Sequence, residues 1–268
     1  MPLSFDLVLA TLARVDEPAR LFESLERQTH RDFRVLLVDQ NDDDRLEPLL
    51  ELQRSFEVVR LRARPGLSHA RNAALSLVEA DAVGFPDDDC VYPDALLKGV
   101  AERLSADPTL DGLTGREPSW TRSAAVLTRR NLWNRAISFT IFLRSSIVER
   151  VGSFDEVLGL PASSGEEIEY LIRAIGDGAR IDYDPALVVD HPEKTHDGAA
   201  VGSRDGASVG YILRKHRYPW WFVARMLVRP AGGALLAAAR RDRADAIFHL
   251  ETLRGRLHGY RDFASAPS

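Results

Sequence analysis

The first half of the chain alternates short apolar runs with segments in which apolar residues recur at helical spacing. The apolar runs predict four strands: Phe5–Ala10, Phe33–Val38, Glu57–Leu61 and Ala82–Phe85. The helical segments between them predict three helices that begin near Asp16, Leu46 and Ser68, where Asp16 and Ser68 could cap their helices. This order predicts an α/β fold with a mostly parallel, doubly wound (Rossmann-like) sheet and helices on both faces.

The second half has a less regular pattern. It predicts three helices and two short strands: Leu96–Leu104, Ile147–Val151, Glu166–Ile175, Arg180–Tyr183 and Leu187–Val189. From Ser203 onward the pattern is helical, with breaks near Pro219 and Pro230. We therefore expect one domain over residues 1–213 and a basic, aromatic-rich helical C-terminal extension over residues 214–268.

Polar side chains follow three of the predicted strands, at the point where each strand ends. They are Thr11, Asp39 and the acidic cluster Asp87–Asp89. In open parallel sheets, ligands bind beyond the carboxyl ends of the strands. This placement is the first indication of a nucleotide site.

The acidic cluster is the strongest local signal. Asp87 and Asp89 are separated by one residue, directly after a buried strand, so their carboxylates can point to the same side. Oxygen ligands of this kind suit Mg²⁺ or Mn²⁺, which a substrate diphosphate would also hold. A solvated acidic turn before the next helix would have the same sequence.

Three further segments could contribute to such a site. Glu166 and Glu167 begin a predicted helix, where acids are favoured by the helix dipole and where one of them could also act as a general base. Arg71 could contact a phosphate or a base, or simply face an acid on an ordinary helix. His191 follows a predicted strand and could be structural, a third metal ligand or a diphosphate contact.

Taken in order, these segments resemble the family 2 glycosyltransferases with the GT-A fold. The resemblance runs from about Phe5 to His191. It is carried by six segments: LFESLERQTHRDFRVLLVDQND, GLSHARNAAL, FPDDDC, FLRSSIVERVGSFDEVLG, GEEIEYLIRAI and YDPALVVDHP. Two positions depart from the family pattern. Gln40-Asn41 stands where the family usually has a second acid followed by Gly-Ser, and Glu167 stands where it usually has Asp.

The resemblance implies an inverting, metal-dependent transfer of a sugar from a nucleotide-diphosphate donor, with a UDP-sugar favoured, to an acceptor hydroxyl. It implies Mn²⁺ or Mg²⁺ as the cofactor. The implied donor contacts are Thr11, Asp39 at the base, Arg71, Asn72 and Asp88. The implied metal residues are Asp87, Asp89 and His191. Either Glu167 or Glu166 would be the catalytic base.

Two other functions remain open at this level. An inactive glycosyltransferase-like domain could serve as a binding or scaffold protein, and the departures at Gln40 and Glu167 are compatible with it. A sugar-phosphate nucleotidyltransferase can share a similar sheet. It would, however, require a glycine-rich loop after the first strand, and the segment ATLARVDEP contains no glycine.

Composition and charge narrow the possible partners. A hydrophobic content of 45% indicates an ordered globular protein, and a net charge of −5 argues against nucleic-acid binding. The single cysteine, Cys90, and an N-terminus without signal-peptide features predict a cytoplasmic protein. No uninterrupted apolar stretch reaches the roughly 18 residues of a membrane span.

The tail has a different balance of charge. Between Arg214 and Arg261 there are eleven Lys or Arg and three Asp or Glu, and Tyr218–Phe222 is rich in aromatic residues. Such a segment is typical of a helix lying on the inner face of the cell membrane, where the acceptor would be a lipid-linked sugar used for surface polysaccharide. A helix packed on the domain, or one in a homodimer contact, would have a similar composition.

Overall fold

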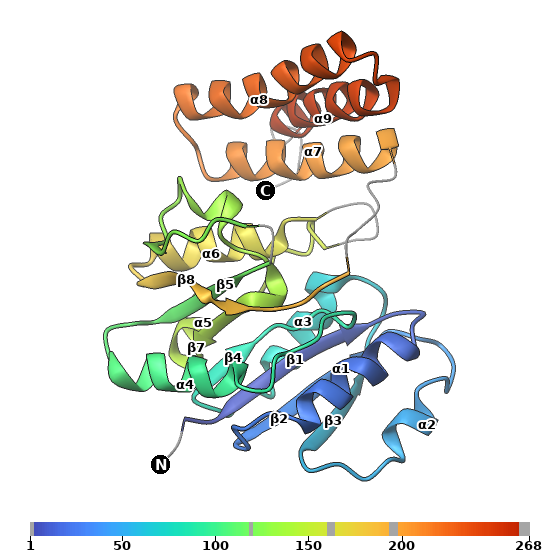
Figure 1. Cartoon of the computed structure of the whole chain (residues 1–268), viewed down its shortest axis with the longest axis vertical. Helices are drawn as coiled ribbons and strands as arrows, with labels where there is room; N and C mark the ends of the chain where they lie inside the picture. The colour runs from blue at the N-terminus through green and yellow to red at the C-terminus, as the bar shows by residue number, and fades with distance from the viewer. Residues whose placement is uncertain (1–2, 118–119, 160–163, 193–197, 263–268) are drawn as a thin grey trace. The chain divides into compact units, whose positions relative to one another are not determined.

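The computed structural model describes residues 3–117, 120–159, 164–192 and 198–262 (Figure 1). The chain divides into two compact units. An α/β unit contains residues 1–156 and 166–192, and a helical unit contains residues 157–165 and 193–268. The boundary expected after residue 213 therefore lies elsewhere, because the helix that contains this residue begins at Gly198 and belongs wholly to the helical unit.

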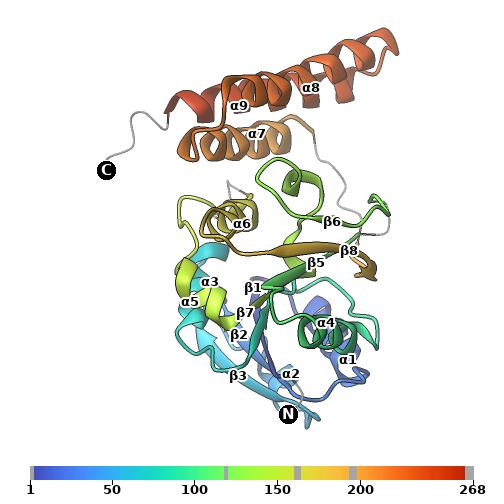
Figure 2. The same ribbon diagram turned by 90° about the vertical axis from the view of Figure 1, so that its left-hand side faces the viewer.

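The α/β unit is built on one mixed sheet with the strand order β3-β2-β1-β4-β7-β5-β8-β6. The strands are β1 (Phe5–Thr11), β2 (Phe33–Asp39), β3 (Glu57–Arg62), β4 (Ala82–Gly84), β5 (Gly112–Arg116), β6 (Ala125–Val126), β7 (Ile141–Arg144) and β8 (Ile181–Val188). The helices are α1 (Asp16–Glu26), α2 (Glu47–Leu50), α3 (Leu67–Leu75), α4 (Leu96–Ala106), α5 (Ser145–Val151) and α6 (Glu166–Gly176). Figure 2 shows α1 and α4 on one face of the sheet and α3 and α5 on the other.

The four strands predicted from the first half of the chain pair with one another in parallel, and β5 and β8 form a further parallel pair. The α/β, mostly parallel fold is thereby confirmed. The sequence did not indicate β5, β6 or β7, and β7 runs antiparallel to both β4 and β5. The two short strands expected near residue 185 are one strand, β8, whose pairing with β5 shifts register between Thr114 and Arg116.

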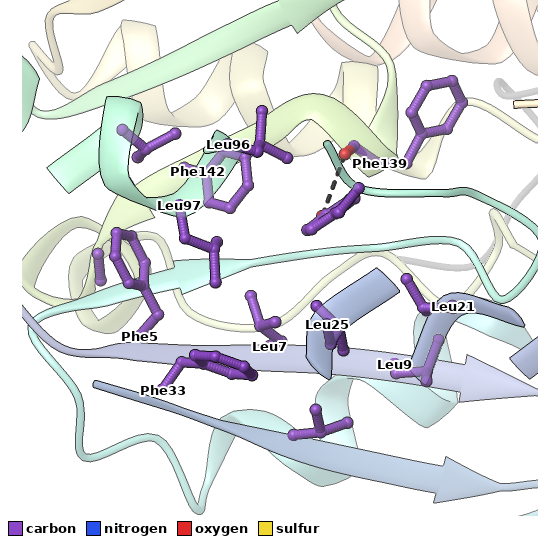
Figure 3. Close-up of a cluster of buried hydrophobic side chains, with 14 of the residues drawn as sticks. Phe5, Leu7, Leu9, Leu21, Leu25, Phe33, Leu96, Leu97, Phe139 and Phe142 are labelled. Carbon is purple, nitrogen blue, oxygen red and sulfur yellow. Dashed lines mark hydrogen bonds between the residues drawn. The ribbon is translucent and has the colours of Figure 1, made fainter. Parts of the chain in front are cut away.

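The core explains why β1 and β2 read as continuous apolar runs. Both faces of these strands are covered, so nearly every residue is buried. On one face, Phe5, Leu7 and Leu9 belong to the same buried cluster as Leu21 and Leu25 of α1 (Figure 3). This packing fixes the register of the parallel strands and hence the position of their carboxyl ends.

The start of α3 differs from the prediction. Ser68 lies inside the helix, and Gly66 precedes it with a φ of 137°, a conformation that favours glycine. The Gly66 amide donates to the side-chain oxygen of Gln40 at 2.7 Å. Gln40, which departs from the family pattern, therefore anchors the loop that leads into α3.

The helical unit contains α7 (Gly198–Lys215), α8 (Trp220–Ala239) and α9 (Arg243–Asp262). Pro219 ends the link between α7 and α8 as expected, whereas Pro230 lies inside α8, which continues without a break. The helices α7 and α9 approach closely through glycines. A Cβ atom at Gly206 would lie 2.4 Å from the backbone oxygen of Thr252.

Candidate active site

Backbone pairing brings the acidic cluster next to two distant segments. Asp87 forms an isolated parallel bridge with Ala10, just before the end of β1, and Val91 forms an antiparallel bridge with Asp190. The first bridge places the cluster beside Thr11, and the second places it beside His191. The sequence predicted the members of this site but not the second bridge, which joins residues about a hundred positions apart.

The three predicted metal residues come together. Asp87, Asp89 and His191 each offer one ligand atom, and these three atoms lie within 4.8 Å of one another. The Nε2 atom of His191 is 2.8 Å from an oxygen of Asp89 and 3.9 Å from an oxygen of Asp87. The Nδ1 atom of His191 is 2.8 Å from the carbonyl oxygen of Pro192, to which it can donate. With Nδ1 protonated, Nε2 can donate to Asp89 when the ring is charged, and it would present a lone pair to a metal ion when the ring is neutral.

The surroundings of this group keep Asp89 charged and hold the His191 ring in place. Burial alone would raise the pKa of Asp89, but the hydrogen bonds and charges of His191 and Arg14 outweigh it and hold the pKa well below its usual range. Asp89 is therefore ionised. The ring of Phe139 stacks on His191 with centroids 4.6 Å apart, which fixes the imidazole plane. Two carboxylates and one imidazole fit Mn²⁺ better than Mg²⁺, which prefers oxygen ligands alone.

Arg71 links the metal residues to Glu166. Its guanidinium lies 2.9 Å from Glu166 and 3.4 Å from Asp87, and the residue is 1% exposed. The rings of Phe85 and Phe154 lie within cation–π distance, at 5.8 and 5.5 Å. The sequence left open whether Arg71 contacts a phosphate or a nucleobase or faces an acid of the protein, and here the side chain is buried between two carboxylates.

The two candidate bases differ in their surroundings. Glu166 is buried and paired with Arg71. Glu167 lines a small pocket with Phe85, Ser138, Phe154 and Tyr170. Burial, followed by the negative charge of Glu166, raises the pKa of Glu167 to about 8.

Asn72 makes contacts within the protein. Its amide nitrogen donates to the backbone oxygen of Phe154 at 3.0 Å, and its amide oxygen accepts from the Phe154 amide at 2.7 Å. A further bond runs to Glu156 at 3.1 Å. Asn72 therefore anchors the loop after α5, next to the phenylalanine that covers Arg71.

Thr11 and Asp88 form the edge of the site nearest β1. The hydroxyl of Thr11 donates to Asp88 at 2.7 Å. Arg14, which sequence reasoning missed, lies 2.6 Å from Asp88 and 2.7 Å from Asp89. Burial raises the pKa of Asp88, although Thr11 and Arg14 oppose the shift. The loop that carries Arg14 is fixed by a bond of 2.7 Å from the Ala13 amide to Asn41.

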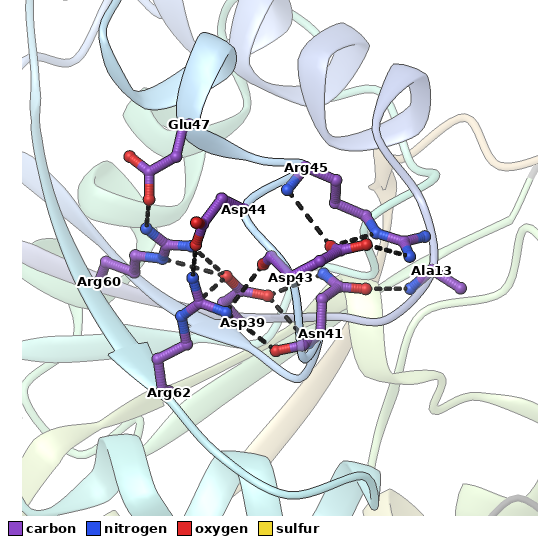
Figure 4. Close-up of polar contacts among 9 residues, drawn as sticks. All are labelled: Ala13, Asp39, Asn41, Asp43, Asp44, Arg45, Glu47, Arg60 and Arg62. Atoms are coloured by element: carbon purple, nitrogen blue, oxygen red, sulfur yellow. Dashed lines mark hydrogen bonds and ion pairs between the residues drawn. The ribbon is translucent and has the colours of Figure 1, made fainter.

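Asp39 lies at the centre of a separate polar cluster (Figure 4). One carboxylate oxygen accepts from the backbone and side-chain nitrogens of Asn41, at 3.0 and 2.7 Å. The other accepts two bonds from Arg60, at 3.0 and 2.6 Å. Burial would raise the pKa of Asp39, but Asn41 and Arg60 together lower it. Both oxygens thus have partners within the protein, and Arg62 lies 3.6 Å away.

Comparison with known proteins identifies the family. A family model described as glycosyl transferase family 2 matches residues 7–151, which is more than half of the chain. The chain belongs to glycosyl transferase family 2. The matched region of this family member includes the acidic cluster and Arg71 but ends before Glu166, Glu167 and His191, which are placed by the structure alone.

Relatives by sequence include the pre-mycofactocin glycosyltransferases of two Mycobacterium tuberculosis strains, CDC 1551 / Oshkosh and ATCC 25618 / H37Rv. Each is 27% identical over 230 residues, which cover 77% of this family 2 chain and 47% of the relative. The chain therefore spans about half the length of these relatives.

Solved structures with the same fold include a mannosyltransferase and a protein bound to a nucleotide sugar. The mannosyltransferase PcManGT from Pyrobaculum calidifontis, in complex with GDP-Man and Mn²⁺, has a TM-score of 0.72 at 16% identity, covering 98% of this chain and 88% of that one. TarS 1-349 of S. aureus, in complex with UDP-GlcNAc, has a TM-score of 0.60 at 17% identity, covering 94% and 92%. These likenesses confirm the GT-A-like fold expected for this family 2 member.

Proposed function

We propose that this protein is an inverting, metal-dependent glycosyltransferase that moves a sugar from a nucleoside-diphosphate donor to an acceptor hydroxyl. The observation that carries the proposal is the convergence of Asp87, Asp89 and His191 at the strand ends. Membership of glycosyl transferase family 2 supports the reaction class.

The donor is a nucleotide sugar. PcManGT was solved with GDP-Man and Mn²⁺, and TarS with UDP-GlcNAc, so both nucleotides occur among proteins of this fold. A UDP-sugar is our first choice, and a GDP-sugar is the second. The nucleobase of the donor would lie near Asp39. Because both carboxylate oxygens of Asp39 already accept hydrogen bonds from Asn41 and Arg60, we infer that Asp39 acts by holding these two side chains in place.

The site residues divide into those that would hold the cation and those that position them. Asp87, Asp89 and His191 supply the ligand atoms. Ser138 donates to Asp87 at 2.8 Å, and Phe139 holds the His191 ring by stacking. A bound divalent cation would neutralise the charge that develops on the departing nucleoside diphosphate.

Glu167 is the proposed general base. Glu166 is committed to Arg71, whereas Glu167 lines a pocket and has a pKa of about 8, close to that of an effective base near neutral pH. It would take the proton of the acceptor hydroxyl as that oxygen attacks the anomeric carbon. The bond from this carbon to the diphosphate breaks with its electron pair on the leaving oxygen. One displacement of this kind inverts the anomeric configuration.

Nucleotide-sugar hydrolysis and donor binding test the proposal. With Mn²⁺ present, the wild-type protein should hydrolyse a UDP- or GDP-sugar slowly, and EDTA should abolish the reaction. Glu167→Gln should lower the rate by about 10²–10⁴-fold while donor binding stays within a factor of about three. Glu149→Gln removes an exposed glutamate on α5 and is the matched control.

Two outcomes would contradict the proposal. Equal rates for Glu167→Gln and Glu149→Gln would remove Glu167 from the mechanism. Tight binding of a nucleotide sugar without hydrolysis or transfer, across a panel of sugars and acceptors, would indicate the scaffold function instead.

A further inference from the structure

The helix α8 exposes an apolar stripe. Trp221 is 40% exposed, Val228 is 67% exposed and Leu235 is 75% exposed, and the neighbouring Trp220 at the N-terminus is 80% exposed. Trp221, Val228 and Leu235 are seven residues apart, which places them on one side of a helix with 3.6 residues per turn. The other side of α8 is also apolar, and its residues Phe222, Pro230, Ala234 and Ala237 are buried.

Cations accompany this stripe. Arg225 and Arg229 are exposed on α8, four residues apart, and flank the stripe on one side, at about 60° and 100° from Val228 around the helix axis. Arg240 and Arg241 are exposed in the turn between α8 and α9, and Arg243 is exposed at the start of α9. With eleven basic and three acidic residues between Arg214 and Arg261, this segment has the charge to attract an anionic surface.

A second exposed apolar row lies on α9. Ile247, Leu250 and Leu257 are 37–49% exposed, at helical spacings of three and seven residues. Arg254 and Arg261 continue the same row and are exposed. Both helices thus combine apolar side chains with arginines on their outer sides, a composition typical of segments that lie at a membrane interface.

The position of the arginines distinguishes two ways of meeting a membrane. By length and composition, α8 is long and apolar enough to cross a bilayer, with a mean hydropathy of 1.3, although core helices pass the same test. A crossing orientation would carry Arg225 and Arg229 into the hydrocarbon, where an arginine is strongly disfavoured. In the plane of the interface, both guanidinium groups reach the lipid phosphates while the stripe faces the acyl chains.

We propose that α8 docks lengthwise on a membrane that contains anionic lipids, with Trp221, Val228 and Leu235 inserted and Arg225 and Arg229 at the headgroups. A second copy of the chain fits this surface less well, because two arginine-rich faces would repel each other. If the proposed function holds, on which this last step rests, docking brings the enzyme to an acceptor sugar carried by a lipid.

Flotation of the full chain with lipid vesicles tests the docking. Wild-type protein should float with vesicles of phosphatidylcholine and phosphatidylglycerol at 70:30, and binding should fall steeply in 0.5 M NaCl or with pure phosphatidylcholine. Arg225→Gln/Arg229→Gln should weaken binding by about 30-fold, at about fivefold for each arginine. Leu235→Glu should weaken it by about tenfold or more.

Matched controls lie on the α/β unit. Arg20→Gln/Arg64→Gln removes two exposed arginines, and Leu52→Glu alters an exposed leucine, so both should float like the wild type. All variants change exposed side chains, and circular dichroism should confirm that they fold. Sugar-nucleotide hydrolysis should be equal in all of them, which separates a failure of docking from a failure of the proposed function.

Three results would overturn the docking. The first is wild-type protein that does not float with the anionic vesicles. The second is equal flotation of Leu235→Glu and Leu52→Glu. The third is a wild-type dimer that Leu235→Glu converts to a monomer, without any flotation, which would assign the stripe to contact between copies of the chain.

Discussion

Arg71 should hold the site together mainly by stabilising the fold. In Arg71→Met the guanidinium disappears from between Glu166 and Asp87, and the buried carboxylate of Glu166 loses the charge that lies 2.9 Å away. Removing one partner of a buried ion pair costs about 3–5 kcal/mol, because the remaining charge stays desolvated. Because methionine keeps the contacts with Phe85 and Phe154, the loss of stability measures mainly the removal of the charge and not a change in side-chain volume.

Urea unfolding measures this loss. With a slope of about 2–3 kcal/mol per molar urea, the midpoint should fall by about 1–2.5 M. Arg71→Met/Glu166→Gln removes the isolated charge as well and should recover about half of the loss. Arg150→Met breaks the exposed pair with Asp177 and should cost less than about 1 kcal/mol.

The contrary result is equally specific. If Arg71→Met kept its stability within about 1 kcal/mol and lost only donor affinity, Arg71 would be a phosphate contact, as the sequence first suggested. The buried bridge between Glu166 and Asp87 would then have no stabilising role.

Three further predictions concern positioning, pH and the helical unit. Ser138→Ala removes the 2.8 Å bond to Asp87 and should weaken Mn²⁺ binding about tenfold by isothermal titration; an unchanged affinity would contradict the positioning role. Because Glu167 is active when ionised and its pKa is raised to about 8, the transfer rate should rise with pH and level off above about 8, and a flat profile from pH 6 to 9 would count against it. Gly206→Val would place side-chain atoms against the backbone oxygen of Thr252 and should lower the melting temperature of the helical unit by several degrees. An unchanged melting curve would argue against the close approach of α7 and α9.

Local pattern predicted the parallel half of the sheet because β1 and β2 are buried on both faces, which leaves continuous apolar runs. It did not predict β5, with the sequence GLTGR, or β7, with IFLR. Both are short and gain their hydrogen bonds from distant strands, so the sequence window around each contains no decisive period.

In the site, too, local sequence predicted some residues and missed the contacts between distant segments. Asp87 and Asp89 could be found because they follow a buried strand directly. The pairing of Arg71 with Glu166 joins residues 95 positions apart, and no local pattern encodes it. The ion pair of Asp39 could have been predicted. Arg60 and Arg62 are two residues apart on β3 and so lie on the same face, and parallel pairing places Arg62 opposite Asp39. Two arginines on one face beside a buried aspartate indicate an ion pair.

Mn²⁺ binding in the presence of a nucleoside diphosphate tests the central claim most directly. Electron paramagnetic resonance counts the Mn²⁺ bound to the wild-type chain and to Asp89→Asn, with UDP or GDP added at saturation. The account predicts one tightly bound Mn²⁺ per wild-type chain and a loss of affinity of about 100-fold or more in Asp89→Asn. Equal stoichiometry and affinity in the two proteins would contradict it.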